Sequence, residues 1–184
     1  MGRPQRIEGY AIVSHEGMIA TAARVMPATL KLDADQRFFH GGLAHAAAVA
    51  NGRHSNEGGP QAAARPRLVL TRRIPAIAAH PHNPHALLWN PAGARFEDAW
   101  DRLQVDGVLA VVGGTDVFGE FLAIGYDVFF LSHAPASVPS GRPVFPGVPE
   151  RTPEAVLTEH GMVSQGTQVL DEASHVTVTR WDRG

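Results

Sequence analysis

Two adjacent glycines end a short apolar run and precede a helix-like pattern. Residues 108–112 have the β-branched, apolar character of a buried strand, Gly113 and Gly114 follow, and an amphipathic segment begins soon after. A helix N-terminus presents free backbone N–H groups and the positive end of the helix dipole, and glycine lets that backbone approach an anion closely. The turn therefore predicts a phosphate site, while a plain tight turn between strand and helix is the alternative.

Two further strand ends carry donors that suit phosphate. Residues 51–55 (NGRHS) end one apolar run with a glycine, a guanidinium group and a hydroxyl, and residues 70–73 (LTRR) end another. Arginine forks match phosphate oxygens, and several donors at the carboxyl ends of strands suit a dinucleotide that lies across the sheet edge. The order of the three segments predicts a dinucleotide site, with solvated surface arginines as the alternative.

A histidine-rich loop offers a different chemistry. His80, His82 and His85 lie close together, and imidazole is a good ligand for zinc or nickel. Metal sites need three or four convergent ligands, and the three prolines of residues 74–85 favour an irregular, solvated loop. Solvated histidines are the favoured interpretation, and no metal is predicted.

The bulk composition excludes several classes of protein. A length of 184 residues suggests one domain, and 44% hydrophobic with 18% charged residues is typical of a soluble globular protein. No apolar run approaches the roughly 20 residues of a membrane helix. Sixteen basic and 18 acidic residues give a net charge of −2, without the cationic excess that nucleic-acid binding requires. Cysteine is absent and the N-terminus has no apolar signal-peptide core, so a cytoplasmic location is expected.

The segments that must position these residues alternate between strand and helix patterns. Strands are predicted over residues 7–14, 48–51, 67–71, 86–89, 108–112, 127–132 and 175–181. Helices are predicted from residue 34 into the forties, over 96–103 and from 117. Asp33 and Gln36 form a capping-box pattern that makes Asp33 the predicted N-cap. This alternation predicts an α/β sheet, mainly parallel, with an antiparallel C-terminal edge.

In this order, the motifs resemble the dihydrofolate reductase superfamily from about residue 7 to residue 146. The matching segments are GRHS at 52–55, LTR at 70–72, VVGGTDVFGEFL at 111–122, LSH at 131–133, and Met26-Pro27 at the place of the family's mobile loop. The resemblance implies a single three-layer domain over residues 1–184, with an eight-stranded, mainly parallel sheet and flanking helices. It also implies NADPH binding and reduction of 7,8-dihydrofolate or a related pteridine.

The resemblance assigns cofactor roles to matching positions. The residues implied at the cofactor are Gly52, Arg53, His54, Ser55, Thr71, Arg72, Gly113, Gly114 and Thr115. The glycine turn would contact the diphosphate at a helix N-terminus, and Thr71 with Arg72 would hold the adenosine 2′-phosphate. The arginines favour NADPH over NADH, because NADPH carries an additional 2′-phosphate and this dianion needs cations around it.

The resemblance also implies a buried carboxylate at the start of the first helix, and two residues fit it. Counting from Met26-Pro27 selects Asp33, whereas counting back from Phe39, which matches the family's ring-packing aromatic residue, selects Asp35. We favour Asp35 as the catalytic acid, because Asp33 is already explained as the cap. A buried carboxylate at Asp35 would have a raised pKa and could help supply a proton. An aspartate that only stabilises the helix dipole is the alternative.

Two more positions complete the implied site, and the departures from the family lie on the substrate side. Ser132 occupies the place of a hydroxyl that bonds the acid, and Arg65 that of an arginine that binds the carboxylate of folate. Ala28 stands where the family usually has Trp, and residues 56–59 are small and polar where the family has bulky side chains. Residues 14–20 also resemble the Ser-x-Asp-Gly-x-Ile-Ala start of the riboflavin-pathway reductases of the same superfamily.

Three functions follow from the resemblance. Reduction of dihydrofolate is the favoured one, and reduction of a ribosylated aminopyrimidine, as in the riboflavin pathway, is the nearest alternative. Nucleotide binding without catalysis is the third. The expected partner is a small-molecule substrate, and the expected assembly is a monomer or a homodimer, because a terminal edge strand is able to pair with a second chain.

Overall fold

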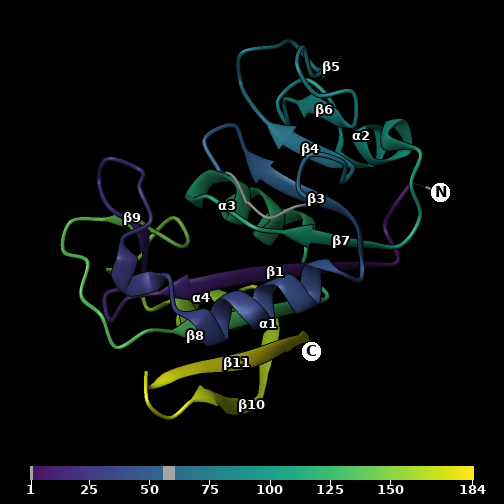
Figure 1. Cartoon of the computed structure of the whole chain (residues 1–184). Helices are drawn as coiled ribbons and strands as arrows, with labels where there is room; N and C mark the ends of the chain where they lie inside the picture. The colour runs from purple at the N-terminus through teal and green to yellow at the C-terminus, as the bar shows by residue number, and fades with distance from the viewer. Residues whose placement is uncertain (1, 56–60) are drawn as a thin grey trace.

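Nine strands of the described residues, 2–55 and 61–184, form one sheet in the computed structural model (Figure 1). They are β1 (Arg6–Val13), β3 (Ala46–Gly52), β4 (Arg67–Leu70), β5 (Ile77–Ala79), β6 (Ala86–Trp89), β7 (Val108–Val111), β8 (Val128–His133), β10 (Met162–Asp171) and β11 (Val176–Arg183). The order across the sheet is β10-β11-β8-β1-β7-β3-β4-β6-β5. A separate two-stranded sheet joins β2 (Met18–Ala20) to β9 (Arg142–Pro143).

The six central strands β8, β1, β7, β3, β4 and β6 are parallel to one another, whereas the strands that flank them on the two sides, β11 and β5, are antiparallel to them. β11 and β10 form the C-terminal edge, and β5 forms the other edge against β6. The expected α/β class, the mainly parallel sheet and the antiparallel C-terminal edge are therefore confirmed. The sheet has nine strands rather than the expected eight, because the proline-containing residues 74–85 include β5, and an edge strand tolerates flanking prolines.

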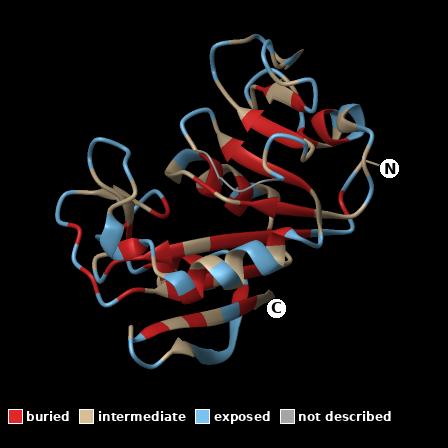
Figure 2. Cartoon of the chain, viewed as in Figure 1, coloured by how far each residue is buried: buried red, intermediate tan, exposed pale blue. Residues whose placement is uncertain are grey.

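Helices cover both faces of the sheet. They are α1 (Asp33–Leu43), α2 (Phe96–Leu103), α3 (Thr115–Ile124) and α4 (Pro153–Glu159), with a short 3₁₀ turn, η1 (Ala28–Leu30). Under α1, Leu43 packs with Val49 and Ala110, whereas Phe96 of α2 and Phe121 of α3 belong to the larger core cluster. The central strands are buried and β10 is exposed along most of its length (Figure 2). No helix within residues 2–55 and 61–184 is both long and apolar enough to cross a membrane.

The start of α1 differs from the sequence prediction, because Leu32 and not Asp33 is the N-cap. Leu32 has an extended backbone, its carbonyl accepts the N–H of Gln36 at 2.9 Å, and no side chain caps the helix. The capping-box prediction is thus wrong. Asp33 and Asp35 both lie in the first turn of α1, where a carboxylate interacts favourably with the helix dipole. Asp33 is exposed, whereas Asp35 is buried.

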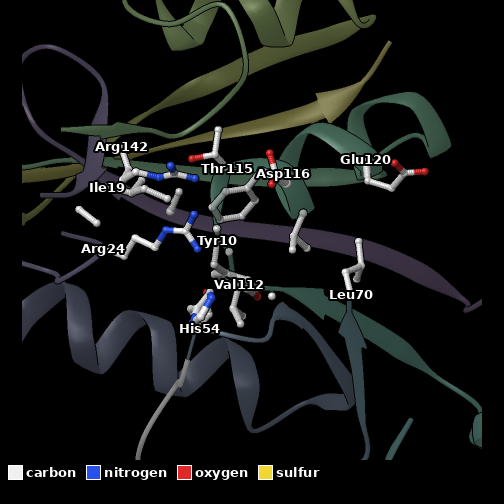
Figure 3. A pocket seen from close by; sticks show the side chains of 18 of the residues that line it. Tyr10, Ile19, Arg24, His54, Leu70, Val112, Thr115, Asp116, Glu120 and Arg142 are labelled. Carbon is white, nitrogen blue, oxygen red and sulfur yellow. The ribbon is translucent and has the colours of Figure 1, made fainter. Parts of the chain in front are cut away.

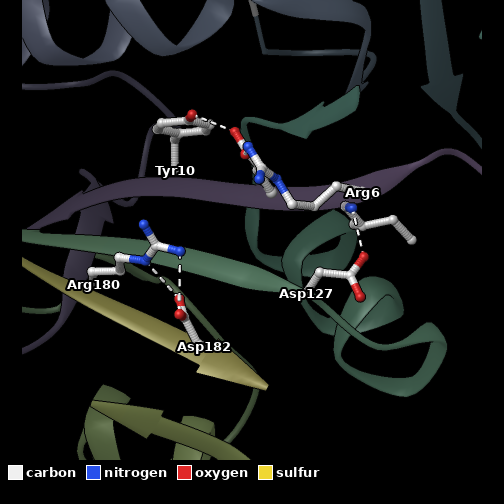
Figure 4. Close-up of polar contacts among 7 residues, drawn as sticks. Arg6, Tyr10, Asp127, Arg180 and Asp182 are labelled. Carbon is white, nitrogen blue, oxygen red and sulfur yellow. Dashed lines mark hydrogen bonds and ion pairs between the residues drawn. The ribbon is translucent and has the colours of Figure 1, made fainter. Parts of the chain in front are cut away.

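A buried carboxylate under α1 holds the hydroxyl group of Tyr10, a residue of β1 whose ring packs against α1. Glu8 is 5% exposed and pairs with Arg6, and the Tyr10 hydroxyl donates a 2.6 Å hydrogen bond to Glu8 Oε2 (Figure 4). Burial and the bond to Glu8 raise the pKa of Tyr10, so the phenol stays protonated and remains the donor. The Tyr10 ring packs so closely on α1 that a Cβ added at Gly42 would lie 2.6 Å from ring carbons. Gly42 therefore makes room for Tyr10.

Candidate functional site

A cavity of about 1050 Å³ opens at the carboxyl ends of the parallel strands (Figure 3). The ends of β3, β4 and β7 reach it through Gly52, Leu70 and Val112, and α1 contributes Asp35 and Phe39. This edge is where ligands bind in open α/β sheets, because loops and helix N-termini converge there. The fold therefore brings the three predicted strand-end segments and the start of α1 to one cavity.

The glycine turn joins β7 to α3 along one wall of the cavity. Gly113 has φ +121°, a backbone conformation that favours glycine, and Gly114 is the N-cap of α3. A Cβ added at Gly114 would find only Ser55 Oγ, at 3.9 Å, so this face of the turn is open to the cavity. The N–H of Gly52 donates to the Gly113 carbonyl at 2.9 Å and holds the two turns together. The turn can thus receive an anion at the α3 N-terminus.

The mouth of the cavity is rich in positive charge. Its described lining includes five arginines against three carboxylates, and the arginines are Arg24, Arg53, Arg72, Arg73 and Arg142. The Arg53 guanidinium, followed by burial and by Arg24 and Arg73, lowers the pKa of His54. Ser55 and Thr71 add hydroxyls to the same lining. This set of donors suits a phosphate-bearing ligand.

Two of these arginines were not found from the sequence. Arg24 lies in a turn that the N–H of Thr21 closes on the Val25 carbonyl at 2.8 Å, and Arg142 belongs to β9. Figure 3 shows both guanidinium groups reaching into the cavity. Pairing of Arg142 with Ala20 brings these distant segments together. No local sequence pattern predicts the pairing of β2 with β9, because both strands are short.

The carboxylate of Asp35 also lines the cavity, next to a hydroxyl. Asp35 is 6% exposed and Ser132 is 2% exposed, and the Ser132 hydroxyl donates to the carboxylate. Burial raises the pKa of Asp35, and the bond from Ser132 offsets part of the increase. Asp33 is exposed and is not among the cavity-lining residues. Of the two aspartates, only Asp35 is placed to exchange a proton with a ligand in the cavity.

Four aromatic side chains form a cluster that lines the same cavity as Asp35. The rings of Tyr10 and Phe130 stack with centroids 5.0 Å apart, and Phe38 meets Phe130 edge-on at 5.3 Å. Phe39 also lines the cavity and lies 6.0 Å from Tyr10. Flat apolar walls next to one buried acid fit a planar heteroaromatic ring that has a nitrogen to protonate.

The remaining features singled out from the sequence are an arginine, a small polar segment and the histidine-rich loop. Arg65 belongs to the turn before β4, where its N–H meets the Gln61 carbonyl at 3.2 Å, and it is not among the described residues that line the cavity. Residues 56–59, where the sequence departs from the family, lie outside the described residues. His80, His82 and His85 form no group of three that could hold a metal ion, judged over the described part of the chain.

Comparisons with known proteins come from solved structures, since no family model and no curated protein matches the chain. A dihydrofolate reductase from Enterococcus faecalis, complexed with NADP(H) and RAB-propyl, is 17% identical with a TM-score of 0.64, over 97% of this chain and 96% of that one. A putative riboflavin biosynthesis protein from Shewanella sp. PV-4 is 13% identical with a TM-score of 0.65, and the alignment covers 98% of this chain and 99% of that one.

A third match is a longer protein. It is a diaminohydroxyphosphoribosylaminopyrimidine deaminase/5-amino-6-(5-phosphoribosylamino)uracil reductase from Thermotoga maritima, 17% identical with a TM-score of 0.67. The alignment covers 99% of this chain but 57% of that one. At these identities the likeness concerns the fold, and it agrees with the strand order and the cavity at the strand ends. The chain therefore has the dihydrofolate reductase-like fold, which the riboflavin-pathway proteins share.

Proposed function

We propose that this chain is an NADPH-dependent reductase that reduces a planar, nitrogen-containing ring, with 7,8-dihydrofolate or a related pteridine as the first candidate. One observation carries the proposal: the described lining of a single cavity includes a glycine turn, five arginines, a buried acid and a cluster of aromatic rings. We place this activity in one domain of residues 1–184, in a cytoplasmic monomer or homodimer whose partner is a small molecule.

The cofactor end of the cavity fits NADPH. Gly113, Gly114 and Thr115 would hold the diphosphate at the α3 N-terminus, with Gly52, Arg53, His54 and Ser55 along its other side. Thr71 and Arg72 would bind the adenosine 2′-phosphate, and such binding would favour NADPH over NADH. When bound, the nicotinamide ring supplies a hydride to the substrate.

Asp35 would perform the acid step. Its raised pKa keeps a larger fraction of the carboxyl protonated near neutral pH than an exposed aspartate has. The protonated carboxyl can give its proton to a ring nitrogen, directly or through a water, and Ser132 holds it in place. Phe39 and Phe130, which line the same cavity, would pack against the faces of the ring beside Asp35.

A ribosylated aminopyrimidine is the second candidate substrate, and the positions of the arginines favour it. Arg65, the implied partner of the folate carboxylate, is not among the described cavity-lining residues, whereas Arg24 and Arg142 are. Two guanidinium groups there suit a substrate that carries a phosphate on its ribose.

The test is to mix the purified protein with NADPH and 7,8-dihydrofolate and to follow the absorbance of the reduced cofactor. Turnover supports the pteridine candidate. Turnover only with the phosphoribosylated aminopyrimidine moves the substrate to the second candidate. NADPH binding without turnover on either substrate contradicts the reductase proposal and leaves a nucleotide-binding protein.

Alanine at Gly114 is expected to weaken NADPH binding about 10- to 100-fold without unfolding the protein. The new methyl group would stand in the open face of the turn and keep the diphosphate away from the backbone, while it clashes with no protein atom. Fluorescence titration with NADPH measures the affinity, and thermal unfolding checks the fold. Gly41→Ala, on the exposed side of α1, is the matched control and should leave the affinity unchanged. An unchanged NADPH affinity in Gly114→Ala would show that the diphosphate does not bind at this turn.

A further inference from the structure

The turn between β1 and β2 carries a carboxylate that the proposed reaction does not use. Glu16 is half-buried and is not among the described residues that line the cavity. Its Oε1 accepts the Ser137 hydroxyl, and its Oε2 accepts the Ser14 hydroxyl at 2.6 Å and the Val138 N–H at 3.0 Å. Ser14 belongs to the same turn, whereas Ser137 and Val138 belong to the loop after β8. One side chain therefore joins two segments that are far apart in the sequence.

These hydrogen bonds favour the ionised form of Glu16. The Ser137 hydroxyl, followed by the Ser14 hydroxyl and the Val138 N–H, lowers the pKa of Glu16 to about 2. The side chain is therefore charged at neutral pH, and hydrogen bonds to a charged acceptor are stronger than bonds between neutral groups. Backbone atoms support the same junction, since the N–H of residue 15 donates to the carbonyl of residue 136 at 2.8 Å.

Val138 connects this junction to an arginine of the cavity. Val138 is 5% exposed, and a Cβ added at Gly141 would lie 2.9 Å from Val138 Cγ1 and 2.5 Å from the Ala20 carbonyl oxygen. Gly141 is thus enclosed between Val138 and β2, with no room for a side chain. Arg142 follows directly, pairs with Ala20 and sends its guanidinium group into the cavity (Figure 3). The place of Val138 therefore affects where Arg142 enters the cavity.

The turn between β1 and β2 holds both ends of the segment that contains Arg142. Val138 is bonded to Glu16 at one end, and the Val144 N–H donates to the Gly17 carbonyl at 3.0 Å at the other. We propose that Glu16 is a positioning residue that fixes Arg142 at the cavity and thereby sets the affinity for an anionic substrate. The effect on substrate affinity rests on the proposed function, whereas the effect on the position of Arg142 does not.

Amide hydrogen exchange of the protein without ligand tests whether Glu16 holds this segment. Glu16→Ala should speed exchange about tenfold at the Val138 N–H, which loses its acceptor, and at the Val144 N–H, which follows the loosened β9. Glu16→Gln retains an acceptor oxygen and should stay close to wild type. Glu150→Ala removes an exposed carboxylate and is the matched control. Unchanged exchange at Val144 would overturn the proposal, because β9 would then keep its place without Glu16.

Steady-state kinetics test the consequence for the substrate. Both candidate substrates are anionic, so with either of them Glu16→Ala and Arg142→Gln should each raise KM about tenfold and leave kcat within about twofold. The double variant should be no worse than Arg142→Gln alone, since two residues that act through one contact are not additive. Additive losses would overturn the proposal, because Glu16 would then act elsewhere. Absence of turnover by the wild type would contradict the reductase function, and hydrogen exchange would still decide whether Glu16 positions Arg142.

Discussion

Replacement of Asp35 by asparagine is expected to lower the rate of reductase turnover at least ~100-fold. Asparagine keeps the size of the side chain and can still accept the Ser132 hydroxyl, but it has no proton to give to the substrate. Steady-state rates with NADPH measure the loss, and NADPH affinity should not change, since Asp35 is not among the residues proposed to hold the cofactor. Asp33→Asn, which alters an exposed carboxylate two residues away, should keep full activity. Loss of activity in Asp33→Asn alone would move the acid to Asp33.

The same substitution should raise stability, and the effect should grow with pH. The pKa of Asp35 is higher in the folded chain than in the unfolded chain because of burial. A carboxyl of this kind stabilises the fold below its unfolded pKa, and that contribution is lost as the pH rises through the folded pKa. Asp35→Asn should thus unfold at a higher temperature than wild type at neutral and alkaline pH, and the difference should shrink in acid. A lower unfolding temperature at alkaline pH would show that the ionised carboxylate is well solvated.

Alanine substitutions at Gly41 and Gly42 are expected to change stability in opposite directions. Both glycines lie in α1, where alanine is intrinsically better by about 1 kcal/mol. Gly41→Ala places its methyl group in open space and should gain about this amount. Gly42→Ala places it 2.6 Å from ring carbons of Tyr10, whose hydroxyl is held by buried Glu8. Overpacking of this kind costs roughly 1–3 kcal/mol, so a net loss is expected.

Chemical denaturation of the two variants measures this contrast directly. The comparison needs no substrate, and each variant is the control for the other, because helix propensity is the same for both. Equal stabilisation of the two variants would mean that the Tyr10 ring moves aside. The hydrogen bond from Tyr10 to Glu8 would then not hold the ring in place.

Local sequence signals predicted the parts of the site that depend on one strand end at a time. The glycine turn at Gly113 and the polar residues after β3 and β4 were predicted to lie together, because parallel strands present their carboxyl ends at one edge, and they do line one cavity. Their convergence on one cavity follows from the parallel order of β7, β3 and β4. The same reasoning failed at Asp33, because the backbone of Leu32, rather than the type of the next side chain, sets where α1 begins.

Other parts depend on contacts between distant segments. Arg24 and Arg142 enter the cavity only because β2 pairs with β9, and no periodic pattern marks either strand. Helix α4 did carry a signal: Thr152 accepts the N–H of Ala155 at 3.1 Å and proline follows it at the first helical position. That combination is typical of a helix start. Its seven residues are too few to show an amphipathic period.

The hydrogen bond from Gly52 to Gly113 has a consequence for how fast and how tightly a dinucleotide would bind. The bond joins the last residue of β3 to the turn after β7, so the two sides of the proposed diphosphate site are already held together before any ligand arrives. Ordering a loop on binding reduces affinity by the conformational entropy that is lost, and here little backbone entropy remains to lose. Association should accordingly resemble rigid docking, with one kinetic phase and slow amide exchange at Gly52 in the free protein.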